Sequence, residues 1–150
     1  MPTITGLTAA GALLGTELIP LDLPAAAGTR SATSAAIAGL AIYAIPQNSQ
    51  STAYTLVLGD AGKHIFHPSA DVTARTWTIP ANASVAFAIG STATFVNQNA
   101  AGVISIAITT DTMRLAGAGT TGTRTLAANG IATALKVTAT EWLISGTGLT

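Results

Sequence analysis

The sequence predicts an all-β protein: a β-sandwich or jelly-roll-like module preceded by an extended, partly helical N-terminal arm. Three observations predict this class. From residue 46 onward, short runs of β-branched and aromatic residues recur at about 8–12 residue intervals, as in sandwiches and barrels. Turn-forming Gly, Asn and Asp residues separate the runs. Strand patterns do not alternate with helix patterns as βαβ units require. We therefore expect two regions, an arm at 1–45 and a β module at 46–150.

The arm is expected to be the attachment segment of the protein. Prolines at positions 20 and 24 exclude a helix interior over residues 17–24 and favour extended backbone in the residues that precede them. Its apolar side chains need a partner surface. The candidate anchor residues are Leu13, Leu14, Leu18, Ile19, Leu21 and Leu23.

A short helix is expected over residues 31–43. Ser31 or Ser34 would cap its N-terminus. Its thin apolar stripe is supplied by Ile37, Leu40 and Ile42. The longest apolar stretch, residues 35–46, is shorter than the roughly 20 residues that span a bilayer.

Nine strands are expected in the β module. They lie at residues 54–58, 63–67, 72–79, 85–89, 92–97, 103–109, 123–127, 131–138 and 141–145. A turn-rich linker at 48–52 precedes them. The turn signals between the runs predict hairpin connections, at residues 59–62, 82–84, 99–102 and 129–130.

The run at 103–109 is the clearest strand, and it predicts the centre of the core. Ile104, Ile106 and Ile108 share one of its faces. We expect them to point inward, opposite apolar residues of other strands. The expected partners are Phe95, Val137 and Trp142.

The composition predicts surface that is concealed by association. Only 8% of the residues are charged, against about 25% in ordinary domains. Ala, Thr and Gly make up 71 of the 150 residues. Thr-rich strand faces suit flat contact between subunits, although a solvated face is the alternative. The zero net charge gives no footprint for nucleic acid, and the absence of cysteine excludes disulfides.

Two histidines are the candidate metal ligands. His64 and His67 lie near Asp60 and Asp71 in the sequence. Residues three apart in a strand point to opposite faces, and zinc requires three or four convergent ligands. Ordinary histidines near a strand end are the favoured interpretation, and we expect neither a metal nor a cofactor.

Two tryptophans have two interpretations. Exposed on a sheet, Trp77 and Trp142 could stack on sugar rings, with Asn97 and Asn99 as further glycan contacts. Both tryptophans lie in apolar strands, however, and core burial is favoured.

The sequence lacks the patterns of an enzyme. The Gly-rich stretch 117–123 is not followed by the Lys and Ser or Thr of a phosphate-binding loop, and a hairpin loop is expected there. No spacing unites the acidic residues into a catalytic pair, and a G-x-S-x-G nucleophile motif is absent. The acidic residues considered are Asp60, Asp71, Asp111 and Glu141, which are expected on surface turns.

Three segments of the β module carry a resemblance. They read YTLVLGDAGKHI at 54–65, WTIPANASVAFAIGSTATFVNQNAAGVISI at 77–106 and LKVTATEWLISG at 135–146. In these segments the motifs D-A-G-K, T-I-P-x-N, V-A-F-x-x-G and E-W-L follow one another. This order resembles that of a module found in tail-fibre, head-fibre and related appendage proteins of tailed bacteriophages. The front of the chain, LTAAGALLGTELIPLDLP followed by GTRSATSAAIAGL, is similar to the attachment arm of such modules.

The resemblance implies a non-enzymatic virion protein: an oligomeric fibre or capsid-decoration subunit that assembles in the bacterial cytoplasm. It also implies a homotrimer that contacts other capsid or tail proteins. The N-terminus lacks the basic region of a secretion signal, which agrees with cytoplasmic assembly. The alternative is a carbohydrate-binding module that recognises host surface glycans.

Overall fold

The computed structural model describes residues 18–21, 30–33, 44–99 and 101–150. The chain divides into two compact units, Met1–Ala44 and Ile45–Thr150, and each is described by itself. In the first unit, β1 (Leu18–Leu21) pairs antiparallel with β2 (Arg30–Thr33). The extended backbone expected around Pro20 is confirmed over β1.

The expected helix at 31–43 is wrong at its start, because Ser31, Ala32 and Thr33 pair with β1. Residues 34–43 lie outside the described residues. Of the candidate anchor residues, Leu18, Ile19 and Leu21 lie in β1, while Leu13, Leu14 and Leu23 fall outside the described ranges.

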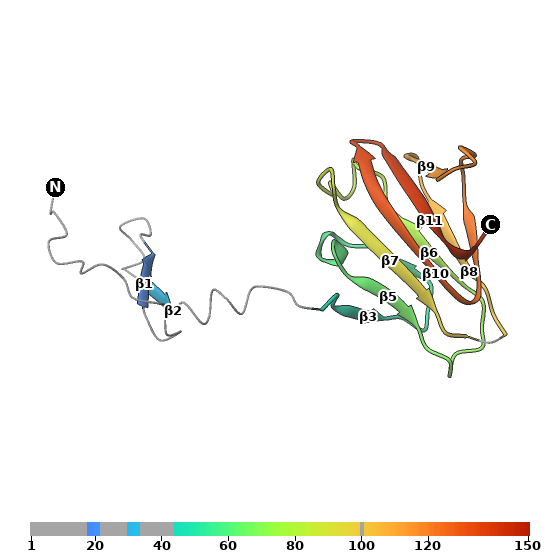
Figure 1. Ribbon diagram of the computed structural model, residues 1–150, viewed down its shortest axis with the longest axis horizontal. Coiled ribbons are helices and arrows are strands. Elements are labelled where there is room, and N and C mark those ends of the chain that lie inside the picture. The colour runs from blue at the N-terminus through green and yellow to red at the C-terminus, as the bar shows by residue number, and fades with distance from the viewer. Residues whose placement is uncertain (1–17, 22–29, 34–43, 100) are drawn as a thin grey trace, which may run out of the picture. The chain divides into compact units, whose positions relative to one another are not determined.

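The second unit is a curled sheet of nine strands, so the all-β class is confirmed for the part of the chain that the structure describes (Figure 1). Its strands are β3 (Gln47–Ser49), β4 (Tyr54–Thr55), β5 (His64–His67), β6 (Arg75–Ile79), β7 (Thr92–Asn97), β8 (Ile104–Ile108), β9 (Thr112–Leu115), β10 (Arg124–Thr138) and β11 (Glu141–Leu149). A short 3-10 helix, η1 (Leu58–Asp60), follows β4. Within the described ranges, we find no helix with the length and apolar character needed to cross a bilayer.

The chain alternates between two sets of parallel strands. One set is β3, β5 and β7, and the other is β4, β6 and β8. Each strand from β3 to β6 therefore pairs with the strand two places further along. Strand β10 joins the sets, because Arg124–Leu126 pair with β8 and Ile131–Leu135 pair with β7. Strand β11 lies along β10 and carries β9 at its other edge.

The expected hairpins between consecutive strands are wrong over β3 to β8. The turn signals do mark changes of direction: residues 82–84 form a turn after β6, and Gly62 has a left-handed φ of 77° before β5. These turns carry the chain from one strand set to the other. Turn chemistry specifies where the chain reverses, whereas the pairing partner depends on which faces are buried together.

Residues 129–130 do not connect two strands but form a bulge inside β10. Asn129 has a φ of 58°, a left-handed conformation that Asn tolerates better than most residues. The β10–β11 register shifts between Leu126 and Ile131. The two runs expected at 123–127 and 131–138 are therefore one bent strand, and the bulge lets it serve both strand sets.

The observed strand bounds agree with the expected ones for some strands and not for others. Strand β7 has the bounds expected for it, and β5 and β8 differ by one residue at their ends. The strand expected at 85–89 is wrong, because these residues form a bend and irregular backbone. Phe87 in this segment packs edge-on against Trp142, at 5.4 Å between ring centroids. Strands β3 and β9 were not expected, and β3 occupies part of the segment interpreted as a linker.

The core lies between the two strand sets. Ile104 and Ile106 are fully buried as expected, and Ile108 is partly buried against the same cluster. Phe95 and Trp142 belong to this core. Val137 does not: it lies on the opposite side of β10 from buried Lys136 and is 37% exposed.

We expect Ile106→Ala to lower the free energy of unfolding by about 2–5 kcal/mol, because the truncation removes a fully buried side chain and leaves a cavity. Chemical denaturation with a tryptophan fluorescence signal measures this change. The matched control is Ser105→Ala on the half-exposed face of the same strand, which should cost much less. Equal losses from the two variants would contradict this assignment of faces.

Candidate functional site

One side of the sheet presents an uncharged surface to its surroundings. Along β10, Ala132 and Ala134 are buried, while Ile131 and Leu135 are 50% and 38% exposed. Thr133, between them, is half-buried. This alternation places apolar side chains on the outer side of the strand, where an isolated sheet carries mostly polar residues.

The register extends this surface across β7, β5 and β3. Ile131 is opposite Val96, and Val96 is opposite Phe66. The next row contains Thr133 and Thr94, whose hydroxyl oxygens lie 3.0 Å apart, and then His64. The threonines therefore form a cross-strand hydrogen bond between the row that contains Ile131 and the row that contains Leu135.

The same surface continues over β11. Leu135 is opposite Leu143, which pairs with Arg114 of β9. The Arg114 Nε donates to Glu141 Oε1 at 2.6 Å, and this ion pair lies at the edge of the surface. We name the whole surface the outer β face. Its members are Gln47, Ser49, His64, Phe66, Thr92, Thr94, Val96, Ile131, Thr133, Leu135, Leu143, Ser145 and Thr147.

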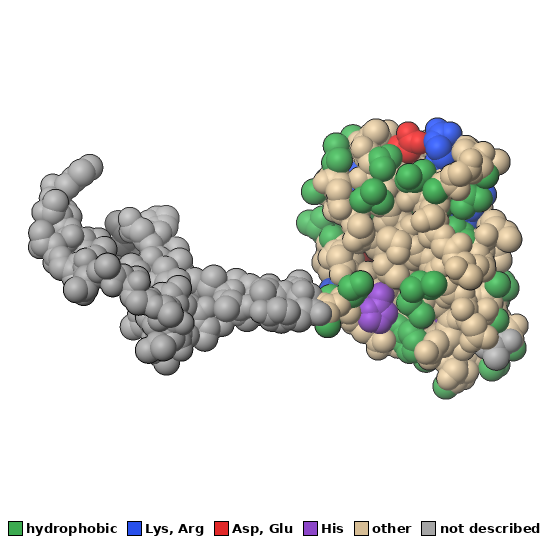
Figure 2. Space-filling model, viewed as in Figure 1, with side chains coloured by type: hydrophobic (Ala, Val, Ile, Leu, Met, Phe, Trp, Pro, Cys, Tyr) green, Lys and Arg blue, Asp and Glu red, His purple; other side chains and the backbone are tan. Residues whose placement is uncertain are grey.

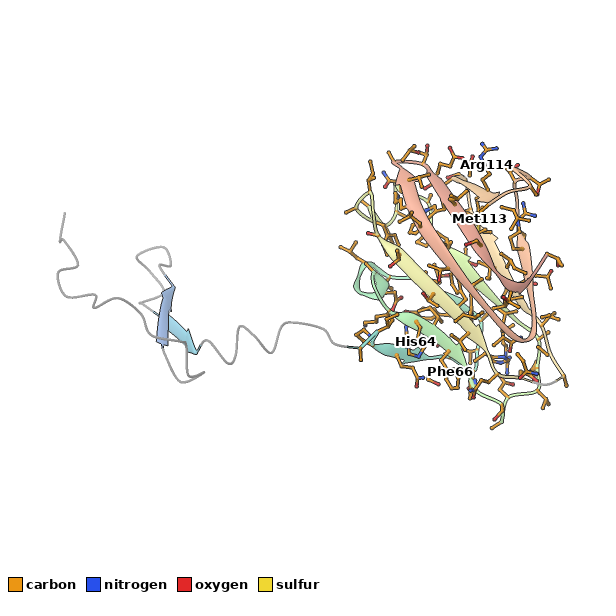
Figure 3. All side chains as sticks on the ribbon, viewed as in Figure 1. His64, Phe66, Met113 and Arg114 are labelled. Carbon is orange, nitrogen blue, oxygen red and sulfur yellow. The ribbon has the colours of Figure 1, made fainter. Side chains whose placement is uncertain are left out.

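Figure 2 shows this face as apolar and neutral polar side chains, with Lys, Arg, Asp and Glu confined to its margins. Figure 3, in the same view, shows His64 and Phe66 on β5 at one end and Arg114 at the other. Apart from His64, the named members carry no ionisable charge near neutral pH. Covering the face would therefore require no desolvation of a fixed charge.

A group of buried polar residues lies elsewhere, on the inner side of β5 and β7. His67 is fully buried, with Nδ1 at 3.0 Å from Asn97 Oδ1 and Nε2 at 3.0 Å from Asp71 Oδ2. Trp77 packs edge-on against its ring, at 5.9 Å between centroids. Both ring nitrogens are therefore occupied by protein partners.

His64 lies on the opposite face of β5, as expected from the strand period. Its Nε2 is 3.0 Å from Gln47 Nε2, and its Nδ1 is 3.1 Å from the Ile45 carbonyl oxygen. The two histidines do not converge. In the described part of the chain, no group of three His, Cys, Asp or Glu residues could hold a metal ion.

The interpretation of Trp77, Trp142, Asn97 and Asn99 as glycan contacts is wrong for this surface, because all four are fully buried. The tryptophans occupy inward strand positions in the apolar core. The asparagines serve the backbone: Asn97 Nδ2 contacts three carbonyl oxygens, and Asn99 Nδ2 donates to the Asp71 carbonyl. None of the four can stack on a sugar ring without unfolding.

The acidic residues are separate structural partners. Asp60 is buried, contrary to the expectation of a surface turn, and accepts hydrogen bonds from Tyr54 Oη at 2.7 Å and Asn48 Nδ2 at 2.9 Å. Burial and this carboxylate raise the pKa of the Tyr54 hydroxyl. Asp111 accepts the backbone N–H of Asn82 at 2.9 Å. These carboxylates are bound to different parts of the sheet and do not form a pair.

The stretch 117–123 forms the expected hairpin loop. Arg114 and Thr121 make an antiparallel bridge, and the Leu115 N–H donates to the Thr120 carbonyl at 2.8 Å. Gly117 and Gly119 have left-handed φ values of 80° and 72°, which these turns require.

Comparison with known proteins identifies no relative of this chain. No family model, no curated protein and no solved structure matches it.

Acid should weaken the fold through Asp71. The hydrogen-bonded Arg75 guanidinium, followed by the His67 ring, holds the pKa of the Asp71 carboxyl well below its ordinary value of about 4. A lowered pKa in the folded state stabilises the protein above the unfolded value, and this contribution is lost as the pH falls below about 4. We expect the melting temperature to fall over that range.

Asp71→Asn tests this assignment. The variant should melt below the wild type at pH 7. The gap should narrow as the pH falls from about 4, because Asp71 of the unfolded wild type then binds a proton that the folded state does not, which favours unfolding. Differential scanning calorimetry from pH 7 to pH 2 measures the gap. A gap that stays constant to pH 2 would show that the Asp71 charge does not stabilise the fold.

Proposed function

We propose that this chain is a non-enzymatic structural protein of a bacteriophage virion, a fibre or capsid-decoration subunit that assembles in the bacterial cytoplasm. In this proposal, residues 1–45 attach the subunit to a capsid or tail protein. Residues 46–150 form a β-sandwich or jelly-roll-like module. The resemblance of the segments at 54–65, 77–106 and 135–146 to phage appendage modules supports the virion setting.

The observation that carries the proposal is the outer β face. Ile131 and Leu135 are large apolar residues that remain 50% and 38% exposed in the single chain. The Ile131 row crosses β5, β7, β10 and β11 without a charged side chain, and the Leu135 row crosses β7, β10 and β11 before it ends at Arg114 on β9. Contiguous apolar surface of this kind marks an interaction site, and the centres of protein interfaces are depleted in charge.

A second copy of the same chain is the proposed occupant of this face. An uncharged face is complementary to another uncharged face, because neither buries an unpaired ion. The low charge of the whole chain agrees with surface that is concealed by association. The resemblance to appendage modules favours three copies. A virion subunit built in this way needs no catalytic group, and the His and Asp residues of the described module have structural partners.

We expect the wild-type chain to scatter light as a particle of about three times its mass of 14.9 kDa. Thr133→Lys should reduce this mass to that of one chain, because it places a charge at the centre of the outer β face. The matched control is Thr76→Lys, an exposed β-strand threonine on β6 of the other strand set. Circular dichroism verifies that both variants fold.

A wild-type monomer at micromolar concentration would overturn the oligomer. Dissociation by Thr76→Lys together with an unaffected Thr133→Lys variant would place the interface on the other strand set instead.

Deletion of residues 1–45 should leave a folded β module that no longer joins virus particles. The second unit, Ile45–Thr150, is compact by itself, which supports separate folding. Thermal melting by circular dichroism measures folding, and co-sedimentation with particles assembled in the host measures incorporation. A truncated chain that unfolds would contradict the separate module, and one that still incorporates would contradict attachment through the arm.

A further inference from the structure

A buried lysine contacts a side-chain amide inside the β module. Lys136, on β10, is 1% exposed, and its Nζ donates to Asn82 Oδ1 at 2.8 Å. The same nitrogen lies 5.4 Å from the centroid of the Trp142 ring, its cross-strand neighbour on β11. Phe87 packs against that tryptophan. The amine and the amide therefore lie in contact beside the aromatic side chains of Trp142 and Phe87.

This lysine has no acidic partner among the described residues. The ion pairs found there join Asp71 with His67 and Arg75, and Glu141 with Arg114. Burial of an ammonium group is costly without a paired anion. A hydrogen bond to a neutral carboxamide and an aromatic face compensate only part of that cost.

We propose that Lys136 and Asn82 become joined by an isopeptide bond between Nζ and Cγ. The lone pair of Nζ attacks the carboxamide carbon, a new C–N bond forms, and the bond from Cγ to Nδ2 breaks. The two protons that the ammonium loses leave with the departing amide nitrogen as one ammonium ion. Atoms and charge balance, and the reaction needs neither an oxidant nor an added reagent.

The fold holds the two reacting groups in place. On β10, the Lys136 N–H donates to the Ser91 carbonyl, and its own carbonyl accepts the Gly90 N–H, both at 2.9 Å. Asn82 begins a turn closed by a hydrogen bond from the Ser84 N–H to the Ala81 carbonyl. When a nucleophile is held beside the carbonyl group that it attacks, the activation free energy is much lower than for the same reaction between separate molecules.

Asp111 is the carboxylate assigned to proton transfer. Its Oδ2 accepts the backbone N–H of Asn82 at 2.9 Å, so it is fixed to the residue that loses its amide nitrogen. Among the described residues Asp111 makes no ion pair with Lys136, so the transfer is assigned to one bridging water: the water passes a proton from the attacking amine to Asp111, and Asp111 returns one to the leaving nitrogen. It is regenerated at the end of the reaction.

The bond would act as a cross-link in a chain without cysteine. It connects positions that are 54 residues apart, which restricts the unfolded chain as a disulfide of similar loop length does. It also replaces a buried ammonium with a neutral amide. This inference is independent of the proposed virion role.

Mass spectrometry of the purified, folded full chain tests the bond. Trypsin cleaves after Lys and Arg, so an unmodified chain gives residues 76–114, 125–136 and 137–150 as separate peptides. The cross-link blocks cleavage after Lys136. It should give one branched species, residues 76–114 joined to 125–150, lighter than the sum of its parts by one ammonia molecule.

Asn82→Ala and Lys136→Met should both abolish the branched species, while Lys63→Met, which removes a different amine, should retain it. Asp111→Asn should fold and form the branched species at least tenfold more slowly. Circular dichroism verifies that the variants fold. If Lys136→Met does not fold, the tryptic peptide masses of the wild type alone decide whether the isopeptide bond is present.

Separate, unmodified peptides from the folded wild type would overturn the proposal and leave a hydrogen bond only. Loss of ammonia without a branched peptide would also overturn it, because cyclisation of an asparagine alone gives that result. An unchanged rate in Asp111→Asn would refute the role of Asp111.

Discussion

The Asn97 side chain lies where the sheet divides, and the two strand sets depend on it. Strands β7 and β8 leave the same side of β10 at different points, because the bulge at Asn129 and Gly130 bends that strand. Backbone groups at such a fork lose their ladder partners. The Asn97 amide nitrogen contacts the carbonyls of Gly102, Leu126 and Ala127 at 3.1–3.3 Å, which replaces the missing partners inside the protein. An apolar residue there would leave buried carbonyls unsatisfied.

The same side chain orders the segments around the fork. Its oxygen lies against His67 Nδ1 and accepts the Asn99 N–H, and His67 in turn contacts Asp71. Asp71 binds Arg75 at the start of β6. One continuous polar network therefore links β5, β6, β7 and β10 beneath the Trp77 ring. The apolar core supplies most of the burial, while this network specifies how the strand sets meet.

Much of the strand content, but not the pairing, was predictable from the sequence. The alternation at Ile104 and Ile106 and the β-branched run of β7 identify those strands because burial of one face imposes a period of two. The strand pairing was not predicted, because turn residues indicate where the chain reverses and not which strand lies next to which in the sheet. Strand β3 was missed because its inward residue, Asn48, is polar and is satisfied by Asp60. The outer β face was foreseen only as a charge deficit and Thr-rich strands, since its rows exist only once the register is known.

The position of β10 in the chain has a consequence for synthesis. Both three-stranded sets, β3 to β8, precede it in sequence, and its two halves complete them. During translation, each set is held only by short parallel pairings with open edges until β10 has left the ribosome. Closure of the sheet is therefore a late event in biosynthesis that requires contacts distant in sequence, which form slowly. Because Thr133 and Leu135 are themselves part of β10 and Leu143 follows on β11, the outer β face cannot be completed before this closure. A nascent subunit thus lacks a finished contact surface until its own core has closed, which orders folding before assembly.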